Sequence, residues 1–205
     1  MVTTVHATSA PLRADAARNR SRILEAALRR VAERGLGDLT MSEVAALAGV
    51  GKGTVFRHFG DRAGLLLALL DHSEKQLQTS FTSGPPPLGP GAPAEARLRA
   101  FGRAVLRQMV HTVDVCLAAH MDPIRRFTTS VYMARLAHVE VLLQEMLPTE
   151  DVELLAHVLM AFLDPALTLA LINQHGMTVD RVEAGWDDLL SRLTASRDRV
   201  GCDDE

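Results

Sequence analysis

The apolar residues between Arg18 and Arg34 are spaced as on one face of a helix, and this spacing restricts the possible folds more than any other feature. They recur at intervals of one, three and four residues, with arginines between them. One Trp, one Tyr and six Phe in 205 residues are few for a β-sandwich or barrel, whose strands rely on aromatic side chains. We therefore predict an all-α fold. The residues of the stripe are Ile23, Leu24, Ala27, Leu28, Val31 and Ala32.

Helix-breaking and helix-capping residues divide the rest of the chain. Gly35 and Gly37 end the first helix, and Thr40-Met41-Ser42-Glu43 has the composition of a capping box, which starts a short helix that Gly49 closes. A Pro- and Gly-rich loop is expected over 82–93, and Pro165 is expected to bend the helix that contains it. Further helices are predicted at Gly53–Phe59, Arg62–Phe81, Ala94–His111, Val113–Met121, Pro123–Met146, Glu150–Asn173 and Val179–Ser196.

Two short helices around Gly49 form the pattern of a helix-turn-helix, which places its second helix in the major groove of DNA. The small side chains of Ala45 and Ala48 allow close packing of the pair, and Val50, Val55 and Phe59 are expected to anchor it to the first long helix. The outward residues of the second helix are then donors that can reach phosphates and base edges. They are Lys52, Thr54, Arg57 and His58.

This segment resembles the N-terminal signature of the TetR family of bacterial transcriptional regulators. The resemblance covers about 50 residues and rests on Thr40, Val44, Ala45, Ala48, Gly49, Val50, Lys52, Gly53, Thr54, Val55, Phe56, His58, Phe59, Arg62 and Leu65. It implies a three-helix DNA-binding domain over 18–65 and a helical effector-binding and dimerisation domain over 66–198. The small and polar residues at the two ends predict a flexible arm over 1–17 and a polar tail over 199–205. The implied function is that of a cytoplasmic homodimeric repressor, released from double-stranded operator DNA by a small-molecule effector.

The resemblance also implies which residues contact DNA. Lys52, Gly53 and Thr54 match base-reading positions, and Arg62 matches a residue that grips a phosphate. Three positions depart from the family pattern: Gly51 replaces Ser, Phe56 replaces Tyr and Arg62 replaces Lys, so one hydroxyl and one phenol are lost. The full set of expected DNA contacts is Thr40, Lys52, Gly53, Thr54, Phe56, Arg57, His58 and Arg62.

The net charge of −3 conceals two parts of opposite sign. Residues 1–65 carry ten basic and six acidic side chains, a net charge of +4, whereas the remaining residues carry twelve basic and nineteen acidic ones, a net charge of −7. Because the basic excess coincides with the helix-turn-helix, we interpret it as the electrostatic basis of DNA binding.

An enzymatic alternative starts from Gly49-Val50-Gly51-Lys52-Gly53-Thr54, which resembles the phosphate loop of adenylate kinases. Such a loop follows a buried strand, but an Ala-rich helix is predicted before Gly49. No nucleophile or acid–base pair is apparent in the sequence either, so we predict a protein that is not an enzyme and uses no cofactor.

An effector pocket is expected where a few polar groups recur among apolar ones on consecutive helices. The candidates are Met109, Cys116, His120, Phe127 and Met133. Cys116 and His120 are four residues apart and could share a metal ion, but without assignable further ligands they are better explained as core or pocket residues, and no metal is predicted. A regulator that binds a metal or a protein remains the alternative.

The segment Glu150–Asn173 is apolar nearly all round, so one amphipathic neighbour cannot cover it. We predict that it pairs with Val179–Ser196 in a four-helix dimer interface; burial of both segments within one chain is the alternative. Glu153, His157 and Asp164 interrupt its apolar run, so no membrane association is predicted. The expected interface consists of Leu155, Leu159, Phe162, Ala166, Leu169, Leu189 and Leu193.

Overall fold

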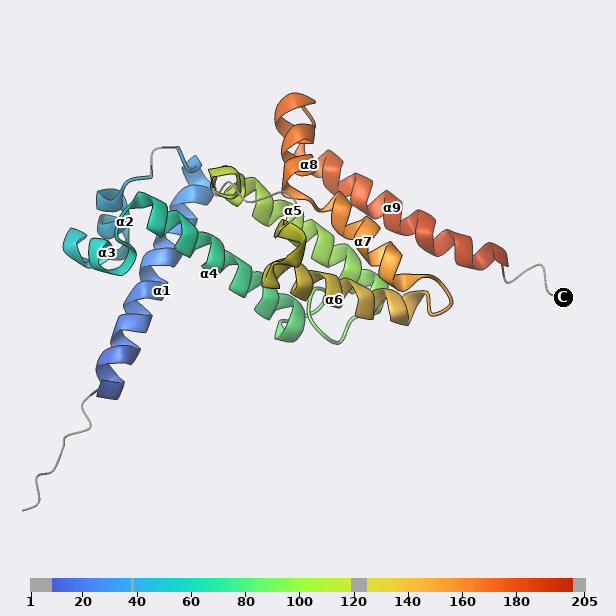
Figure 1. Cartoon of the computed structure of the whole chain (residues 1–205), viewed down its shortest axis with the longest axis horizontal. Coiled ribbons are helices and arrows are strands. Elements are labelled where there is room, and N and C mark those ends of the chain that lie inside the picture. Colours follow the sequence, from blue (N-terminus) through green and yellow to red (C-terminus); the bar gives the residue numbers. More distant parts are fainter. Residues whose placement is uncertain (1–8, 38, 119–124, 201–205) are drawn as a thin grey trace, which may run out of the picture. The chain divides into compact units, whose positions relative to one another are not determined.

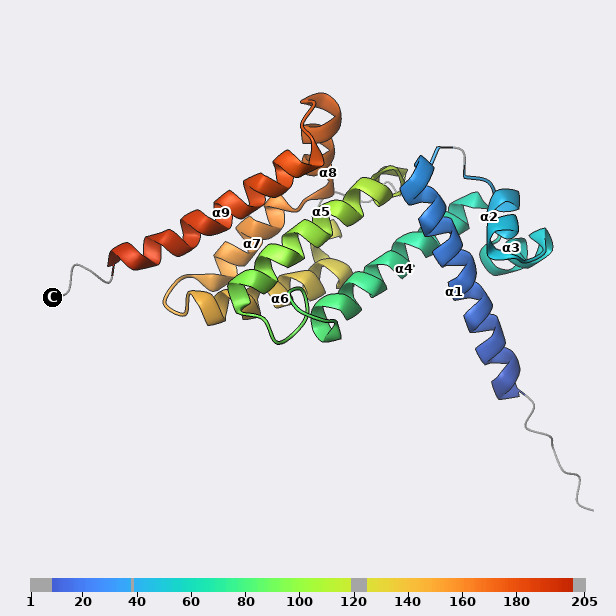
Figure 2. The same cartoon turned by 180° about the vertical axis from the view of Figure 1, so that it is seen from behind.

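The computed structural model describes residues 9–37, 39–118 and 125–200, with side chains described over 15–37, 39–109 and 127–195. These ranges contain helices and connections and no strand, which confirms the predicted all-α class (Figures 1 and 2). In chain order the helices are α1 (Ser9–Arg34), α2 (Met41–Ala48), α3 (Lys52–Phe59), α4 (Arg62–Ser83), α5 (Ala94–Ala118), η1 (Arg125–Thr128), α6 (Ser130–Met146), α7 (Val152–Phe162), α8 (Pro165–Leu169), η2 (Ala170–Gln174) and α9 (Val179–Val200).

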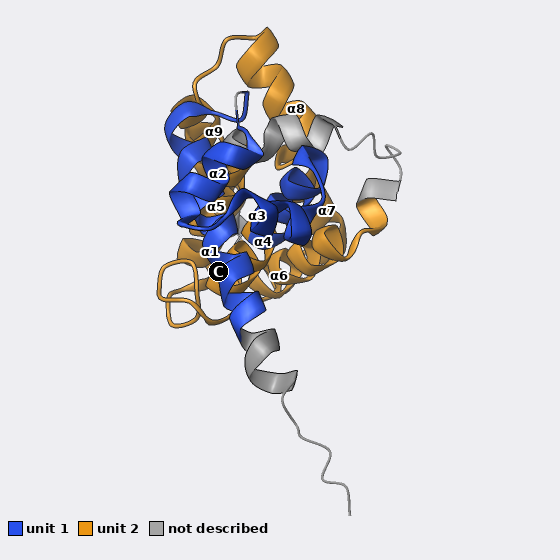
Figure 3. Cartoon of the chain, turned by 90° about the vertical axis from the view of Figure 1, so that its left-hand side faces the viewer, with its two compact units in different colours: residues 1–72 blue, residues 73–205 orange. Residues whose placement is uncertain are grey.

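The chain divides into two compact units between His72 and Ser73 (Figure 3). The division falls inside α4, which is one continuous helix. The boundary predicted from the sequence falls after Leu65, at the end of the family signature. Since α4 contributes residues to both units, no break in composition marks the position.

The first helix is longer than predicted. α1 begins at Ser9, not at Arg18, so the arm predicted over 1–17 is wrong for residues 9–17. The physical reason is the composition of that stretch, which holds four alanines, one leucine and one arginine between Ser9 and Arg18, all strong helix formers.

Helices α1, α2 and α3, with the start of α4, build the core of the first unit. Most of the apolar stripe predicted on the first helix is buried, and the N-terminal cap of α2 is the predicted one, because the Thr40 hydroxyl accepts from the backbone N–H of Glu43. Gly49 ends α2 with φ of 65°, a left-handed conformation that favours glycine. The buried residues include Ile23, Leu24, Ala27, Val31, Val44, Ala45, Ala48, Val55, Phe59, Leu65 and Leu69.

In the second unit α5 runs beside α9, and α6 packs on both α5 and α7 (Figures 1 and 2). Trp186 of α9 is fully buried and contributes the largest side chain of this core. Arg103 and Arg107 on α5 pair with Asp187 and Glu183 on α9, which adds a row of ion pairs along the crossing. The core of the second unit therefore depends on α5 as its central helix.

Three predicted helices have different limits in the structure. The two helices expected over Ala94–His111 and Val113–Met121 are one helix, α5, because the stretch between them contains neither Gly nor Pro. The helix expected from Pro123 begins at Ser130, where the Thr129 hydroxyl caps α6 by accepting from the backbone N–H of Tyr132.

The apolar segment predicted over Glu150–Asn173 is divided, not bent. Asp151 and Asp164 cap α7 and α8, and Pro165 opens α8 at a position where a proline needs no hydrogen-bond partner. By length and composition alone, Val152–Gln174 is apolar enough to cross a membrane, with a mean hydropathy of 1.9. The two caps make it a pair of short helices followed by a π-helical turn.

Candidate functional site

Helix α3 presents most of its predicted DNA contacts to solvent. Its buried side is formed by Val55 and Phe59, as the sequence predicts. Gly51 caps α3 without a side-chain hydrogen bond, which confirms that the departure from Ser at this position removes a cap. On the other side Lys52, Gly53, Phe56 and Arg57 are exposed, while Thr54 and His58 are half-buried.

Two cations of α3 are available to an external partner. The ammonium group of Lys52 lies 5.8 Å from the ring centroid of Phe56, which is itself 42% exposed. Arg57 makes no ion pair within the described part of the chain. A helix that exposes cations beside an aromatic ring offers both charge and a flat contact surface to a polyanion.

The arginines of α1 have a different role from the one that the charge count suggested. The Arg22 guanidinium donates to the carbonyl of Ala48 at the end of α2, over 3.1 Å, and the Arg20 guanidinium lies 5.5 Å from the ring centroid of Phe59. Side chains that hold the first unit together are thus part of the basic excess. Exposed cations remain on both helices, Arg29 and Arg34 on α1 and Lys52 and Arg57 on α3.

Arg62 is another arginine engaged within the first unit. Its Nε donates to the carbonyl of Leu39 over 3.0 Å, and its Nη2 donates to the carbonyls of Leu36 and Gly37 over 2.9 and 3.3 Å. Most of its donors therefore hold the connection between α1 and α2. The sequence alone offered no sign of this, because the three acceptors are backbone atoms more than 20 residues away.

Glu43 completes the cap of α2 and pairs with α1. The Nε of Arg30 donates to its carboxylate over 2.5 Å, and the backbone N–H of Thr40 donates to it as well. These hydrogen bonds, the one from Arg30 first, lower the pKa of Glu43. Thr40 thus stands next to a carboxylate whose charge Arg30 compensates.

The predicted effector pocket is only partly assembled. Cys116 and His120 lie outside the residues whose side chains are described. Met109 is buried in the core, where it accepts from the Thr168 hydroxyl, and Met133 is 51% exposed on α6. Of the three described candidates, Phe127 borders a cavity.

That cavity lies between α6 and the start of α8, and has a volume of about 140 Å³. Apart from Phe127, its lining residues were not predicted from the sequence. The signal that could have identified it is a single arginine in the apolar helix over 130–146, since a buried charge requires a built environment. The lining residues are Phe127, Thr129, Val131, Tyr132, Arg135, Met160, Leu163, Asp164 and Pro165.

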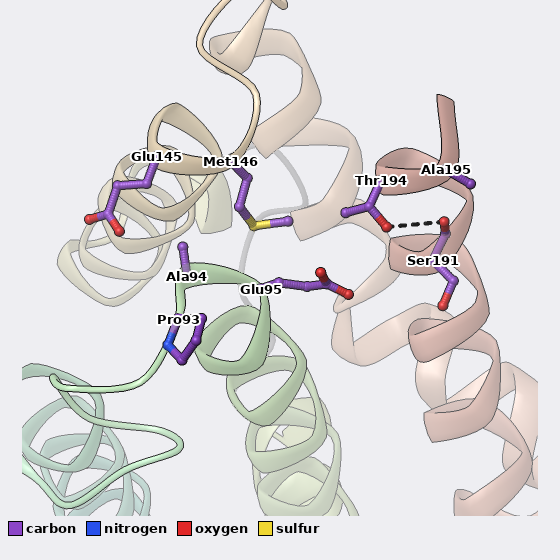
Figure 4. Close-up of a pocket in the computed structure, with 8 residues that line it drawn as sticks. All are labelled: Pro93, Ala94, Glu95, Glu145, Met146, Ser191, Thr194 and Ala195. Carbon is purple, nitrogen blue, oxygen red and sulfur yellow. Dashed lines mark hydrogen bonds between the residues drawn. The ribbon is translucent and has the colours of Figure 1, made fainter. Parts of the chain in front are cut away.

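A larger hollow of about 680 Å³ lies among the start of α5, the end of α6 and the end of α9 (Figure 4). It is lined mainly by polar and small groups. Of its two carboxylates, Glu95 already accepts from the Arg99 guanidinium over 2.7 Å. This hollow shows none of the mixture of apolar walls and convergent polar groups that marks a small-molecule site.

Most residues of the predicted dimer interface are at least partly covered within their own chain. Leu159 is 1% exposed, and Leu155, Phe162, Leu169, Leu189 and Leu193 pack against the core of their own chain; only Ala166 is exposed. The apolar stripe that was predicted to contact a second subunit packs instead against the apolar faces of α5 and α6.

The other face of α7 remains uncovered. Leu154 is 60% exposed and Val158 is 52% exposed, and Ala161 lies one turn further on the same face. The prediction that one neighbour cannot cover this helix is thus confirmed, although the uncovered face is a different one.

Residues 23–69 match the sequence model of the tetR family of bacterial regulatory proteins. The regulator TtgR of Pseudomonas putida is 42% identical over 57 residues, which are 28% of this chain and 27% of TtgR. The regulator SAB2452 of Staphylococcus aureus is 34% identical over 70 residues, which are 34% of this chain and 38% of SAB2452. The matched region thus spans about a quarter to two fifths of the length of these relatives.

Solved structures resemble the chain over most of its length. A TetR-family regulator from Rhodococcus has a TM-score of 0.57 at 19% identity, covering 86% of this chain and 99% of its own. A regulator from Saccharomonospora viridis, solved in complex with choline, has a TM-score of 0.61 at 22% identity, covering 85% of this chain and 96% of its own. These likenesses establish the fold, and residues 23–69 form a DNA-binding region like that of the tetR family of bacterial regulatory proteins.

Proposed function

We propose that this protein is a cytoplasmic transcriptional repressor that binds operator DNA as a homodimer and is released by a small-molecule effector. The observation that carries the proposal is the exposed side of α3, where Lys52 and Arg57 extend from a helix whose other side, Val55 and Phe59, is anchored in the first unit. The regulators that match this region support the assignment of the helix to DNA.

In this proposal the two α3 helices of a dimer enter successive major grooves, about 34 to 36 Å apart. Lys52, Gly53 and Thr54 read bases, and Thr40, Phe56, Arg57 and His58 contact groove walls and phosphates. Arg62 belongs to the same surface by family resemblance, but its three carbonyl acceptors support an indirect role: it fixes the connection that precedes α2.

The dimer is proposed to form through the uncovered face of α7 together with α9. Leu154 and Val158 supply large apolar groups, and α9 exposes Ala184, whose small size permits close approach of a second helix. A second copy of the chain would remove these groups from water.

The effector proposal rests on the cavity bordered by Phe127 and Arg135, which lies in the second unit. The choline complex of the Saccharomonospora viridis regulator supports a small organic ligand for this fold. No catalytic role is proposed, since the relatives that match are named as transcriptional regulators.

Selection of bound sequences from a random DNA library by the purified protein tests this function. We expect enrichment of a near-palindromic site. Lys52→Ala should lower the affinity for that site by about 1 to 3 kcal/mol if Lys52 reads a base. Arg29→Ala is the matched control, because it removes one exposed charge of the same unit from α1. Failure to enrich any sequence, or equal losses in both variants, would contradict the proposal.

A further inference from the structure

The cavity between α6 and α8 has the size of a single ring. Its volume of about 140 Å³ is close to that of an engineered apolar cavity, about 150 Å³, which binds benzene. Met160 and Leu163 form buried apolar walls. A ligand that fills this space has about six to nine non-hydrogen atoms, on the same comparison.

Two aromatic side chains border the space. The rings of Phe127 and Tyr132 meet edge to face with centroids 5.4 Å apart. Aromatic ligands pack favourably on such a pair in offset or edge-on geometry. The Tyr132 hydroxyl lies 2.8 Å from Nδ1 of His157, so the phenol is held in place and provides one polar group at the edge of the cavity.

The one buried cation of the lining is already compensated. Arg135 is 9% exposed, and its Nε and Nη2 donate to the two carboxylate oxygens of Glu74 over 2.8 and 2.5 Å. Its Nη2 also donates to the side-chain oxygen of Gln108 over 3.0 Å. An anionic ligand would have to replace Glu74, and a cationic one would lie against the guanidinium group.

The surroundings of Tyr132 also disfavour an anionic ligand. The pKa of its phenol is raised, first by burial and then by the nearby carboxylates of Asp164 and Glu140. Burial and negative charge that oppose a phenolate also oppose a bound carboxylate. Burial opposes an ion of either sign, and the guanidinium group of Arg135 borders the space that a cation would occupy, so the lining suits an uncharged molecule best.

We propose that this cavity binds an uncharged single-ring compound, and that such a compound is the effector. The second clause rests on the proposed function. The cavity and α4 are connected through Arg135: a ligand that displaces its guanidinium changes its hold on Glu74, which lies on α4, the helix that contributes residues to both units. Arg135 is thus a positioning residue between ligand and helix.

Three compounds of nearly equal size test the class: benzyl alcohol, benzoate and benzylammonium. Their binding to the full-length protein is measured by calorimetry and by the shift in melting temperature. We expect benzyl alcohol to bind at least tenfold more tightly than either ion. Tighter binding of an ion, or no saturable binding of any of the three at millimolar concentration, would overturn the assignment.

Two substitutions on one helix test the position. Val131 borders the cavity and is 41% exposed, whereas Met133 is 51% exposed and does not border it. Val131→Trp should lower the affinity for benzyl alcohol at least tenfold, and Met133→Trp should leave it within twofold of the parent. Because both side chains are at the surface, neither change threatens the core. Equal effects of the two substitutions would place the ligand elsewhere.

The role as effector is measured separately, as the change in operator affinity when benzyl alcohol is added. We expect a weakening that Glu74→Gln reduces at least threefold while benzyl alcohol still binds. Binding of benzyl alcohol without any change in operator affinity would overturn the role as effector and leave the ligand class intact. A protein that binds benzyl alcohol but no DNA would instead contradict the proposed function.

Discussion

Gly102 of α5 lies directly against the indole ring of Trp186 on α9. A Cβ atom placed on Gly102 would be 2.0 Å from Cε2 of Trp186, well inside van der Waals contact. Trp186 is 0% exposed, so the ring has no open side into which it could withdraw. The approach of α5 to α9 therefore depends on the missing side chain at position 102.

Gly102→Ala should destabilise the second unit. An added methyl group must push the indole ring or separate the helices, and such overpacking costs about 1 to 3 kcal/mol. The change is measured as the free energy of unfolding in urea. Gly185→Ala is the control, because a Cβ there would be 3.6 Å from Phe162, an ordinary contact on an exposed helix position. It should be neutral or stabilising by up to about 1 kcal/mol. Equal destabilisation by both changes would show that the contact with Trp186 is not the cause.

Arg62→Met should destabilise the first unit, because the connection between α1 and α2 loses three hydrogen bonds to its carbonyls. At about 0.5 to 1 kcal/mol each, the expected loss is about 1.5 to 3 kcal/mol. Thermal unfolding measures it, and Arg29→Met, which removes an exposed arginine from α1, is the control.

The salt dependence of operator binding separates the two roles of Arg62. If the residue only holds the connection, Arg62→Met lowers the affinity but leaves the slope of affinity against salt concentration unchanged. If it grips a phosphate, as the family resemblance implies, the slope becomes smaller by about one unit. An unchanged melting temperature together with a smaller slope would contradict the structural role.

The sequence predicts local features of this fold well. The capping box at Thr40, the left-handed turn at Gly49 and the buried pair Val55 and Phe59 all depend on residues within a few positions of one another. Such features are encoded in short segments, because caps and helix periodicity have fixed spacings.

Features that depend on distant residues were not predictable in the same way. Leu159 belongs to an apolar stripe that looks the same in the sequence whether it faces α6 or a second subunit. Only the packing of the second unit shows which of the two it contacts. In the sequence, Arg135 is only a single arginine in an apolar helix. Its partner Glu74 lies 61 residues earlier, and only the fold brings the two side chains together. The donors of Arg62 face backbone carbonyls, which carry no sequence signal at all.

His138 should make stability fall in mild acid. Its ring contacts those of Phe81 and Phe101, with centroid distances of 4.4 and 5.1 Å, and burial, followed by the charge of Arg97, lowers its pKa from 6.5 to about 4. The unfolded chain therefore binds a proton at His138 below pH 6.5, whereas the folded chain binds that proton only below about pH 4. The contribution of neutral His138 is complete above that window and is lost as the pH falls through it.

His138→Phe removes this linkage and keeps a ring in the cluster. The measured quantity is the change in melting temperature between neutral pH and the lower end of the window, and the decrease should be smaller in the variant than in the parent. His175→Gln, at an exposed position after η2, should retain the decrease of the parent. A variant with phenylalanine that loses as much stability in acid as the parent would show that other groups dominate.

The exposed face of α7 should control assembly. Leu154→Arg and Val158→Arg each place a charge where a second copy of the chain is proposed to pack, and both positions are more than half exposed in the single chain, so folding itself should not suffer. An unpaired charge that becomes buried on association costs several kcal/mol, enough to shift a micromolar dimer to monomer. Sedimentation at micromolar concentration should give the mass of one chain. Leu67→Arg is the control, since Leu67 is 56% exposed on α4 and lies outside the proposed interface; that variant should keep the mass of two chains. If the α7 variants still sediment as dimers, the second copy binds through another surface.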